Sequence, residues 1–215
     1  MILLCSMPAF VALTAVAPVS MQEPSAAQQP PPAPDAWAFQ ASAYYSNPPN
    51  SEDRLIGIIY ADRGPLHLEF RYNYEDLDTA ALFTGWKIPV QGNEISGTLT
   101  PMAGIVFGAT DGIAPGLEAD LDWDRLNFYT EDEYLFDFGD SSDNFFYSWS
   151  TLTWGFTEQL RAGVVAERNR VVNTGLTIQR GLIFQYAFQQ TALSLYTYNI
   201  GTSDSYTVIS IGYSH

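Results

Sequence analysis

The sequence predicts an all-β fold, an antiparallel transmembrane β-barrel of about twelve strands spanning residues 36–215. Apolar and polar residues alternate along most segments, as expected for strands whose side chains point to two faces in turn. Turn-forming residues separate these segments roughly every ten to sixteen residues. The segments run for roughly nine to twelve residues, which is enough to cross a bilayer at a tilt, whereas strands of soluble sandwiches are usually nearer five or six.

The N-terminal part of the chain predicts export. Residues 2–17, ILLCSMPAFVALTAVA, have the length and composition of the apolar core of a signal peptide. We place the signal peptide at residues 1–27, ending at small residues, and a Pro-rich linker, QQPPPAPD, at residues 28–35. A buried N-terminal helix is the alternative for the first segment. The folded domain is expected to begin at residue 36.

The segment PLHLEFRYNYE, residues 65–75, has the clearest alternation in the chain. Its apolar face would carry Leu66, Leu68, Phe70, Tyr72 and Tyr74. Its polar face would carry His67, Glu69, Arg71, Asn73 and Glu75. One face meeting lipid and the other meeting water explains this pattern.

The segment GLEADLDWDRL, residues 116–126, has an acid at every second position. These acids are Glu118, Asp120, Asp122 and Asp124. The last three and Glu131 match the first three ligand positions and the final one of a calcium-binding EF-hand loop, but Arg125 replaces the glycine that the loop needs. A strand with the acids on one face and apolar residues on the other is the better interpretation. A turn near Asp124 and Arg125 would end it.

Later segments repeat the alternation, with some exceptions. EQLRAGVVAE, residues 158–167, sets small apolar residues against Arg161 and Glu167, and TIQRGLIFQYAFQ, residues 177–189, has an aromatic face. In FYTEDEYLF, residues 128–136, Asp132 would face lipid unless a bulge or turn intervenes. Arg180 also falls on an apolar face, which suits a position near the membrane interface.

The alternating strands, their aromatic ends and the export signal together resemble a bacterial outer-membrane β-barrel over residues 36–215. The resemblance implies a location in the outer membrane of a Gram-negative cell, with lipid outside the barrel and an aqueous lumen inside. It implies no particular chemistry. The final segment, YTVISIGYSH, departs from the pattern because it finishes at His215 rather than at an aromatic residue.

Composition excludes several classes of protein. The chain has 24 acidic and 9 basic residues, for a formal charge of -15, so binding to nucleic acid is not expected. The single cysteine, Cys5, allows neither a disulfide nor a cysteine metal site. A metal site would need carboxylates with His67 or His215. We predict no cofactor and no metal.

The polar strand faces provide the candidate functional residues. The expected lumen-lining residues are His67, Glu69, Arg71, Lys87, Glu118, Asp120, Asp122, Arg161 and Glu167. A water-filled pore would use the acid excess to attract cations. A closed barrel would instead be filled by paired charges. We favour a narrow porin-like channel for small solutes or cations, with outer-membrane lipid as its surroundings and its oligomeric state open.

Two other functions remain as alternatives. A lipid-acting hydrolase of the barrel type would need a serine, a histidine and an acidic or polar partner, and neither histidine belongs to a recognisable triad in the sequence. We therefore assign no catalytic residue. A soluble exported β-sandwich or barrel that binds an apolar ligand would reverse the two faces, but the polar faces are more charged than an ordinary ligand cavity.

Overall fold

The structure, a computed structural model, describes residues 36–49, 52–139, 141–171 and 177–215. The predicted signal peptide and linker lie outside these residues. The described elements are β1 (Ala38–Ser46), β2 (Arg54–Arg63), β3 (Leu66–Tyr72), β4 (Thr79–Trp86), β5 (Ile88–Gln91), β6 (Ser96–Gly108), β7 (Gly112–Trp123), β8 (Leu126–Asp137), η1 (Ser141–Asp143), β9 (Phe145–Gly155), β10 (Leu160–Val171), β11 (Thr177–Phe188), β12 (Thr191–Tyr198) and β13 (Tyr206–Ser214).

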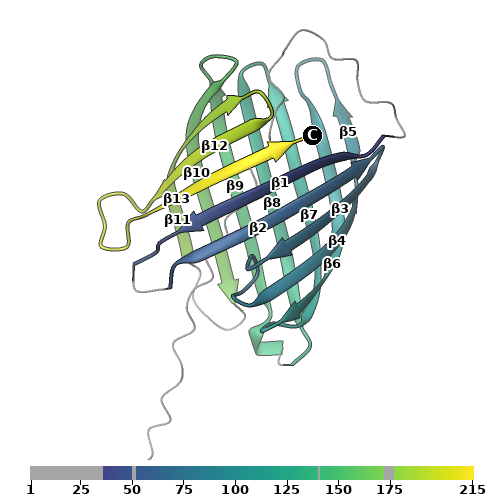
Figure 1. Cartoon of the computed structure of the whole chain (residues 1–215), viewed down its shortest axis with the longest axis vertical. Helices are drawn as coiled ribbons and strands as arrows, with labels where there is room; N and C mark the ends of the chain where they lie inside the picture. The colour runs from purple at the N-terminus through teal and green to yellow at the C-terminus, as the bar shows by residue number, and fades with distance from the viewer. Residues whose placement is uncertain (1–35, 50–51, 140, 172–176) are drawn as a thin grey trace, which may run out of the picture.

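The strands form one antiparallel sheet that closes on itself (Figure 1). Apart from β4 and β5, which do not pair with each other, each strand pairs with the next along the chain; β1 also pairs with β13, and β4 pairs with β6. The short β5 follows β4 after Lys87 and pairs with the same neighbour, β6. The wall is therefore a twelve-stranded barrel, which confirms the predicted fold class.

Both ends of the barrel-forming chain lie at the same end of the barrel. The amide of Phe39 donates to the carbonyl of His215 at 3.0 Å, and the amide of His215 donates to the carbonyl of Phe39 at 2.8 Å. An even number of antiparallel strands produces this arrangement. We call this the terminal end and the opposite one the loop end.

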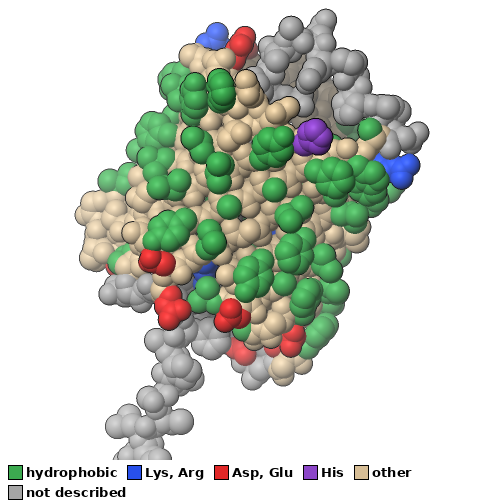
Figure 2. All heavy atoms as spheres, viewed as in Figure 1, with side chains coloured by type: hydrophobic (Ala, Val, Ile, Leu, Met, Phe, Trp, Pro, Cys, Tyr) green, Lys and Arg blue, Asp and Glu red, His purple; other side chains and the backbone are tan. Residues whose placement is uncertain are grey.

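The apolar strand faces point outward. On β3, Leu68 and Phe70 are exposed, whereas His67, Glu69 and Arg71 between and beside them are buried. Figure 2 shows hydrophobic side chains spread over the middle of the visible face, with acidic side chains along its lower edge. The alternative of a soluble ligand-binding barrel, whose apolar strand faces would point inward, is therefore wrong. A closed barrel with an apolar outer belt is a membrane-spanning structure, and the chain is located in the outer membrane.

The turns also fit a barrel in an outer membrane. At the terminal end the strands are joined by residues 64–65, 92–95, 124–125, 156–159 and 189–190. At the loop end, connections such as 73–78 and 199–205 are longer. Outer-membrane barrels have short periplasmic turns and longer extracellular loops. Within the described residues, no helix is long and apolar enough to cross a membrane.

Three local details differ from or refine the sequence analysis. The break predicted near Asp124 and Arg125 is confirmed, and Asp124, with φ of 55°, belongs to that turn rather than to the acidic strand face. The β3 strand ends at Tyr72, and Asn73 turns the chain with φ of 57°. Tyr74 is therefore buried inside the barrel, not on the apolar outer face where simple alternation placed it.

No bulge moves Asp132 away from the outer face. The β8–β9 register is continuous from Leu126 to Leu135, so Asp132 keeps the orientation that alternation predicts. The hydroxyl of Thr130 donates to Asp132 at 3.2 Å and lies 2.9 Å from the hydroxyl of Ser150. A small polar patch thus interrupts the apolar belt.

Candidate functional site

Arg71 is the centre of a buried charge cluster inside the barrel. Its guanidinium donates to both carboxylate oxygens of Glu69, at 2.8 and 2.9 Å. The Nη1 atom lies 2.7 Å from Glu131, 2.9 Å from Glu133 and 3.5 Å from Glu75. All five side chains are buried. One guanidinium therefore holds four carboxylates.

This cluster crosses the interior. Arg71 and Glu69 are on β3, whereas Glu131 and Glu133 are on β8, and the wall between these strands contains β4, β6 and β7. Inward-facing side chains thus meet across the interior. Arg71 also lies over the rings of Tyr74 and Phe83, 4.4 and 4.2 Å from their centroids. The barrel is consequently constricted at this level.

A second group surrounds His67 toward the terminal end. The imidazole Nδ1 atom is 2.7 Å from Asp62, and the ammonium group of Lys87 donates to the other oxygen of Asp62 at 2.9 Å. The Nε2 atom of His67 lies 3.8 Å from Glu69. Glu118 from β7 completes this group, because ligand atoms of His67, Glu69 and Glu118 all lie within 4.8 Å of one another. Residues from β2, β3 and β7 are thereby brought together.

The acidic row on β7 is held by side chains of β8. The amide of Asn127 donates to Asp120 at 2.6 Å and to Asp122 at 3.1 Å. Tyr129 donates to Glu118 at 3.2 Å. These donors fix the three carboxylates one behind another along the strand.

Arg161 lies near the terminal end of this row. It donates to the hydroxyl of Thr153 at 3.2 Å and to the carbonyl of Arg125 at 3.3 Å, and it interacts electrostatically with Asp122 and Asp120. The guanidinium of Arg161 thus partly compensates the negative charge of Asp120 and Asp122.

The opposite part of the interior is mainly aromatic. The indole of Trp149 donates to the hydroxyl of Tyr198 at 3.0 Å, and the rings of Tyr198 and Tyr206 stack 4.9 Å apart. Glu167 and Arg54 are both buried there and attract each other electrostatically. Glu167 therefore does not belong to the cluster around Arg71.

The residues proposed from the sequence fall into three places in the structure. His67, Glu69, Arg71 and Glu118 form one connected group with Lys87 at its edge, Asp120 and Asp122 extend it toward Arg161, and Glu167 lies apart. The lumen-lining set expected from the sequence lacks Arg54, Asp62, Glu131 and Glu133, and it also leaves out Glu75, although alternation placed Glu75 on the polar face. Alternation in residues 128–136 could have indicated Glu131 and Glu133, because they share the face opposite Asp132. Nothing in the sequence indicates that they meet Arg71.

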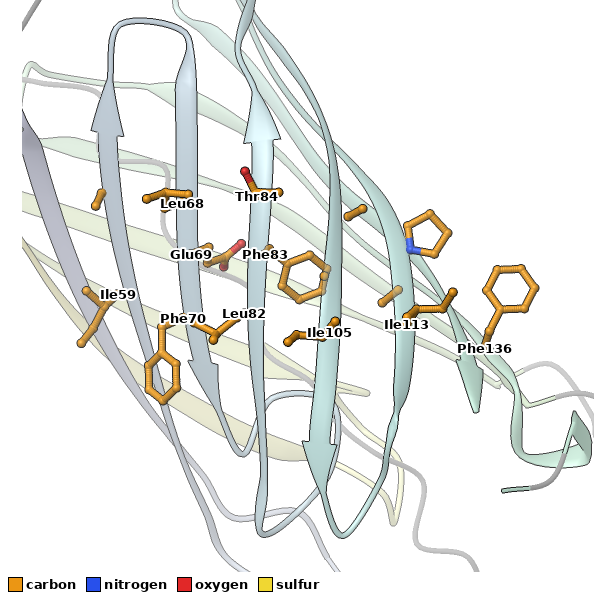
Figure 3. Close-up of a pocket in the computed structure, with 15 residues that line it drawn as sticks. Ile59, Leu68, Glu69, Phe70, Leu82, Phe83, Thr84, Ile105, Ile113 and Phe136 are labelled. Carbon is orange, nitrogen blue, oxygen red and sulfur yellow. The ribbon is translucent and has the colours of Figure 1, made fainter. Parts of the chain in front are cut away.

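A hollow also lies on the outer wall, across β2, β3, β4, β6 and β7 (Figure 3). Its lining is almost entirely apolar, and the labelled side chains include Ile59, Leu68, Phe70, Leu82 and Ile105. Most of these side chains belong to the apolar belt. The hollow is therefore mainly a feature of the lipid-facing surface, and Glu69 and Phe83, which contact Arg71 inside the barrel, also line it.

Comparison with known proteins gives similarity of fold without similarity of sequence. No protein-family model matches the chain. No curated protein matches it either. Among solved structures, the KdgM porin is similar over 82% of this chain and 99% of its own, with 10% identity and a TM-score of 0.58. The NanC porin is similar over 81% of this chain and 97% of its own, with 11% identity and a TM-score of 0.53.

The chain has the fold of an outer-membrane porin. A second structure of the KdgM porin, in complex with disordered oligogalacturonate, is similar over 83% of this chain and 99% of its own, with 10% identity and a TM-score of 0.56. Identities this low show a shared architecture. They do not show that any residue of the charged interior has a counterpart in these porins.

Proposed function

We propose that the barrel is a narrow porin-like conduit whose acidic interior favours cations and small uncharged or cationic solutes. The observation that supports this proposal is the charge balance inside the barrel. Among the described residues classed as buried, five glutamates face two arginines and one histidine. An excess of fixed negative charge in a confined space attracts cations and repels anions.

The connections at the loop end of the barrel are also negatively charged. They carry Glu52, Asp53, Asp76, Asp78, Asp111, Asp143 and Asp204, and their sequences contain no lysine or arginine. Such a mouth raises the local concentration of cations before they enter. Lys87, Arg63, Arg125 and Arg161 lie at or near the terminal end, whereas Arg54, Arg168, Arg170 and Arg180 lie on strands toward the loop end, so the acid excess at the loop end belongs to the connections.

The row on β7 suits passage rather than tight capture. Alternate residues of a strand are about 6.5 to 7 Å apart, so Glu118, Asp120 and Asp122 form successive weak sites. Asn127 donates hydrogen bonds to Asp120 and Asp122, and Tyr129 donates one to Glu118, so the carboxylates are held in successive positions along the strand. Attraction at each step without a firm hold on monovalent cations is what conduction requires.

The acidic interior also bears on the class of solute. The KdgM porin forms a complex with oligogalacturonate, a saccharide that carries a carboxylate on each sugar. Such a polyanion would meet repulsion in the interior of this barrel. We therefore propose that polyanionic saccharides are excluded here despite the shared fold.

A closed barrel is the second candidate, and the bridge between Arg71 and Glu131 favours it. Paired charges that cross the interior can block it as well as shape it. The role of the protein would then lie in its loops or its outer wall, where the apolar hollow suits outer-membrane lipid chains. The hydrolase alternative gains no support, because in the described part of the chain His67 pairs with carboxylates rather than with a serine.

Conductance of the purified barrel in planar bilayers tests the proposal. We expect small single-channel currents and a reversal potential in a KCl gradient whose sign shows preference for K⁺. Replacing Asp120 and Asp122 together by asparagine should reduce that preference. Asp124→Asn is the matched control, since Asp124 is exposed in the adjoining turn. A wild-type barrel that inserts but never conducts would leave the closed barrel as the function.

A further inference from the structure

We propose that His67, Glu69 and Glu118 form a binding site for a divalent transition-metal ion of the zinc class inside the barrel. The site goes beyond conduction, because it concerns equilibrium binding of one ion at one place. It combines an imidazole with two carboxylates from strands that are distant in the sequence. Nothing in the sequence spacing of these residues indicates such a site.

The geometry provides three converging ligands. One ligand atom from each of the three side chains lies within 4.8 Å of those of the other two. Bonds from zinc to imidazole nitrogen and carboxylate oxygen are about 2.0–2.2 Å, so a bound ion needs its ligands slightly closer together. Glu118 is only partly buried and is held by a single hydrogen bond from Tyr129, so it can make this small movement.

The histidine is already oriented as metal-binding histidines are. Its Nδ1 atom is fixed by Asp62 at 2.7 Å. Its Nε2 atom is buried, has no hydrogen-bond partner within the described residues, and lies 3.8 Å from Glu69. Metal-ligating histidines almost always donate their other ring N–H to a carboxylate or carbonyl in this manner. Asp62 is therefore the positioning residue, and Lys87 in turn holds Asp62.

The balance of charge around the site also favours a bound cation. Glu69 is paired with Arg71, and Asp62 is paired with Lys87. In the described part of the chain, Glu118 accepts its hydrogen bond from the neutral hydroxyl of Tyr129. A divalent ion between Glu118 and Nε2 of His67 would compensate the negative charge of Glu118. It would also give the buried nitrogen a bonding partner.

The ligand set distinguishes between classes of metal. Imidazole nitrogen suits zinc, iron, nickel and copper, whereas Mg²⁺ and Ca²⁺ prefer oxygen ligands alone. The proposed site therefore binds Zn²⁺ or Co²⁺ in preference to Ca²⁺. Ca²⁺ bound as tightly as Zn²⁺ would show that the acidic cluster binds cations without His67, which contradicts the proposal.

Equilibrium dialysis of the detergent-purified full chain with Zn²⁺, together with visible absorption of Co²⁺, tests the site. The chain should carry no polyhistidine tag. We expect one ion per chain and a Co²⁺ spectrum that indicates nitrogen and oxygen ligands. His67→Gln and Glu118→Gln should each weaken Zn²⁺ binding at least about tenfold, and Asp62→Asn should weaken it about 10- to 100-fold through the orientation of His67.

Two controls distinguish this site from general attraction to an acidic protein. His215→Ala removes the other histidine, and Glu167→Gln removes a buried glutamate outside the site, so neither should alter Zn²⁺ binding. Heat-modifiable gel migration establishes that each variant is folded, and only folded protein is compared. If folded wild-type chain binds neither ion, or if His67→Gln binds Zn²⁺ as tightly as wild type, the proposal is wrong. Because binding is measured without a bilayer, a barrel that does not conduct could still pass this test.

Discussion

Arg71 on β3 and Glu131 on β8 form an ion pair across the barrel interior, with 2.7 Å between Nη1 of the arginine and Oε1 of the glutamate. Both side chains are fully buried. Because the two strands are not neighbours in the wall, the pair connects parts of the barrel that backbone hydrogen bonds do not connect directly. The same contact narrows the interior, so it links stability to permeability.

Arg71→Met should destabilise the barrel and widen the constriction. Removing the guanidinium leaves buried carboxylates without their partner, a change that costs about 3–5 kcal/mol when a buried ion pair is broken. We expect a lower urea midpoint of unfolding and a larger conductance. Glu131→Gln is the control, because Arg71 keeps Glu69 and Glu133 in that variant, and its loss of stability should be much smaller. Equal stability of Arg71→Met and wild type would contradict this role.

Phe184→Lys should block stable insertion, whereas Gln185→Lys on the same strand should be mild. Phe184 is exposed on the apolar belt and Gln185 points to the other face. A lysine facing the middle of the bilayer costs about 2–4 kcal/mol. Folding into lipid vesicles, followed by heat-modifiable gel migration, measures the difference. Similar damage at both positions would mean that the two faces are misassigned.

Gly181→Ala should reduce stability because of a close approach between strands. A Cβ atom there would overlap the carbonyl oxygen of Thr197 on β12. Overpacking of this kind typically costs about 1–3 kcal/mol, and the backbone neighbour cannot rotate away. Gly57→Ala on β2 is the matched control, since a Cβ atom at that position meets nothing within 4 Å. Urea unfolding in vesicles should show a lower midpoint for Gly181→Ala alone.

Asp132→Leu should stabilise the barrel in a bilayer. The carboxylate lies on the outer face and receives a hydrogen bond from Thr130. An acidic side chain on the lipid face is unfavourable, although less so than lysine or arginine, so a gain on the order of 1 kcal/mol is expected. Asp204→Leu, in the exposed connection between β12 and β13, should not raise the midpoint. A lower midpoint for Asp132→Leu would instead show that the hydrogen bond from Thr130 outweighs the cost of an acidic side chain on the lipid face.

Strand identity and orientation were predictable from the sequence because they depend on local alternation. On β3, the side-chain period of two was enough to assign Leu68 and Phe70 to one face and His67, Glu69 and Arg71 to the other. The turn at Asp124 and Arg125 could be predicted for the same reason. Tyr74 was misassigned because Asn73 adopts a left-handed conformation that ends the alternation, and no pattern of polarity reveals that change.

Alternation alone gives Glu69 and Gln185 the same inward position, so a charged replacement would be expected to be equally mild at both. The structure shows Glu69 holding Arg71 through two hydrogen bonds, so the two positions are not equivalent. A difference of this kind arises from contacts rather than from the face that a residue occupies.

The sequence by itself determined that the chain forms an outer-membrane barrel, because alternation and segment length are local properties. Only the tertiary structure decided which charges meet. Arg71 and Glu131 are 60 positions apart in the printed sequence, and His67 and Glu118 are similarly remote. Strand pairing and barrel closure bring these side chains together, and a pattern along one strand contains no information about the side chains that face it across the interior.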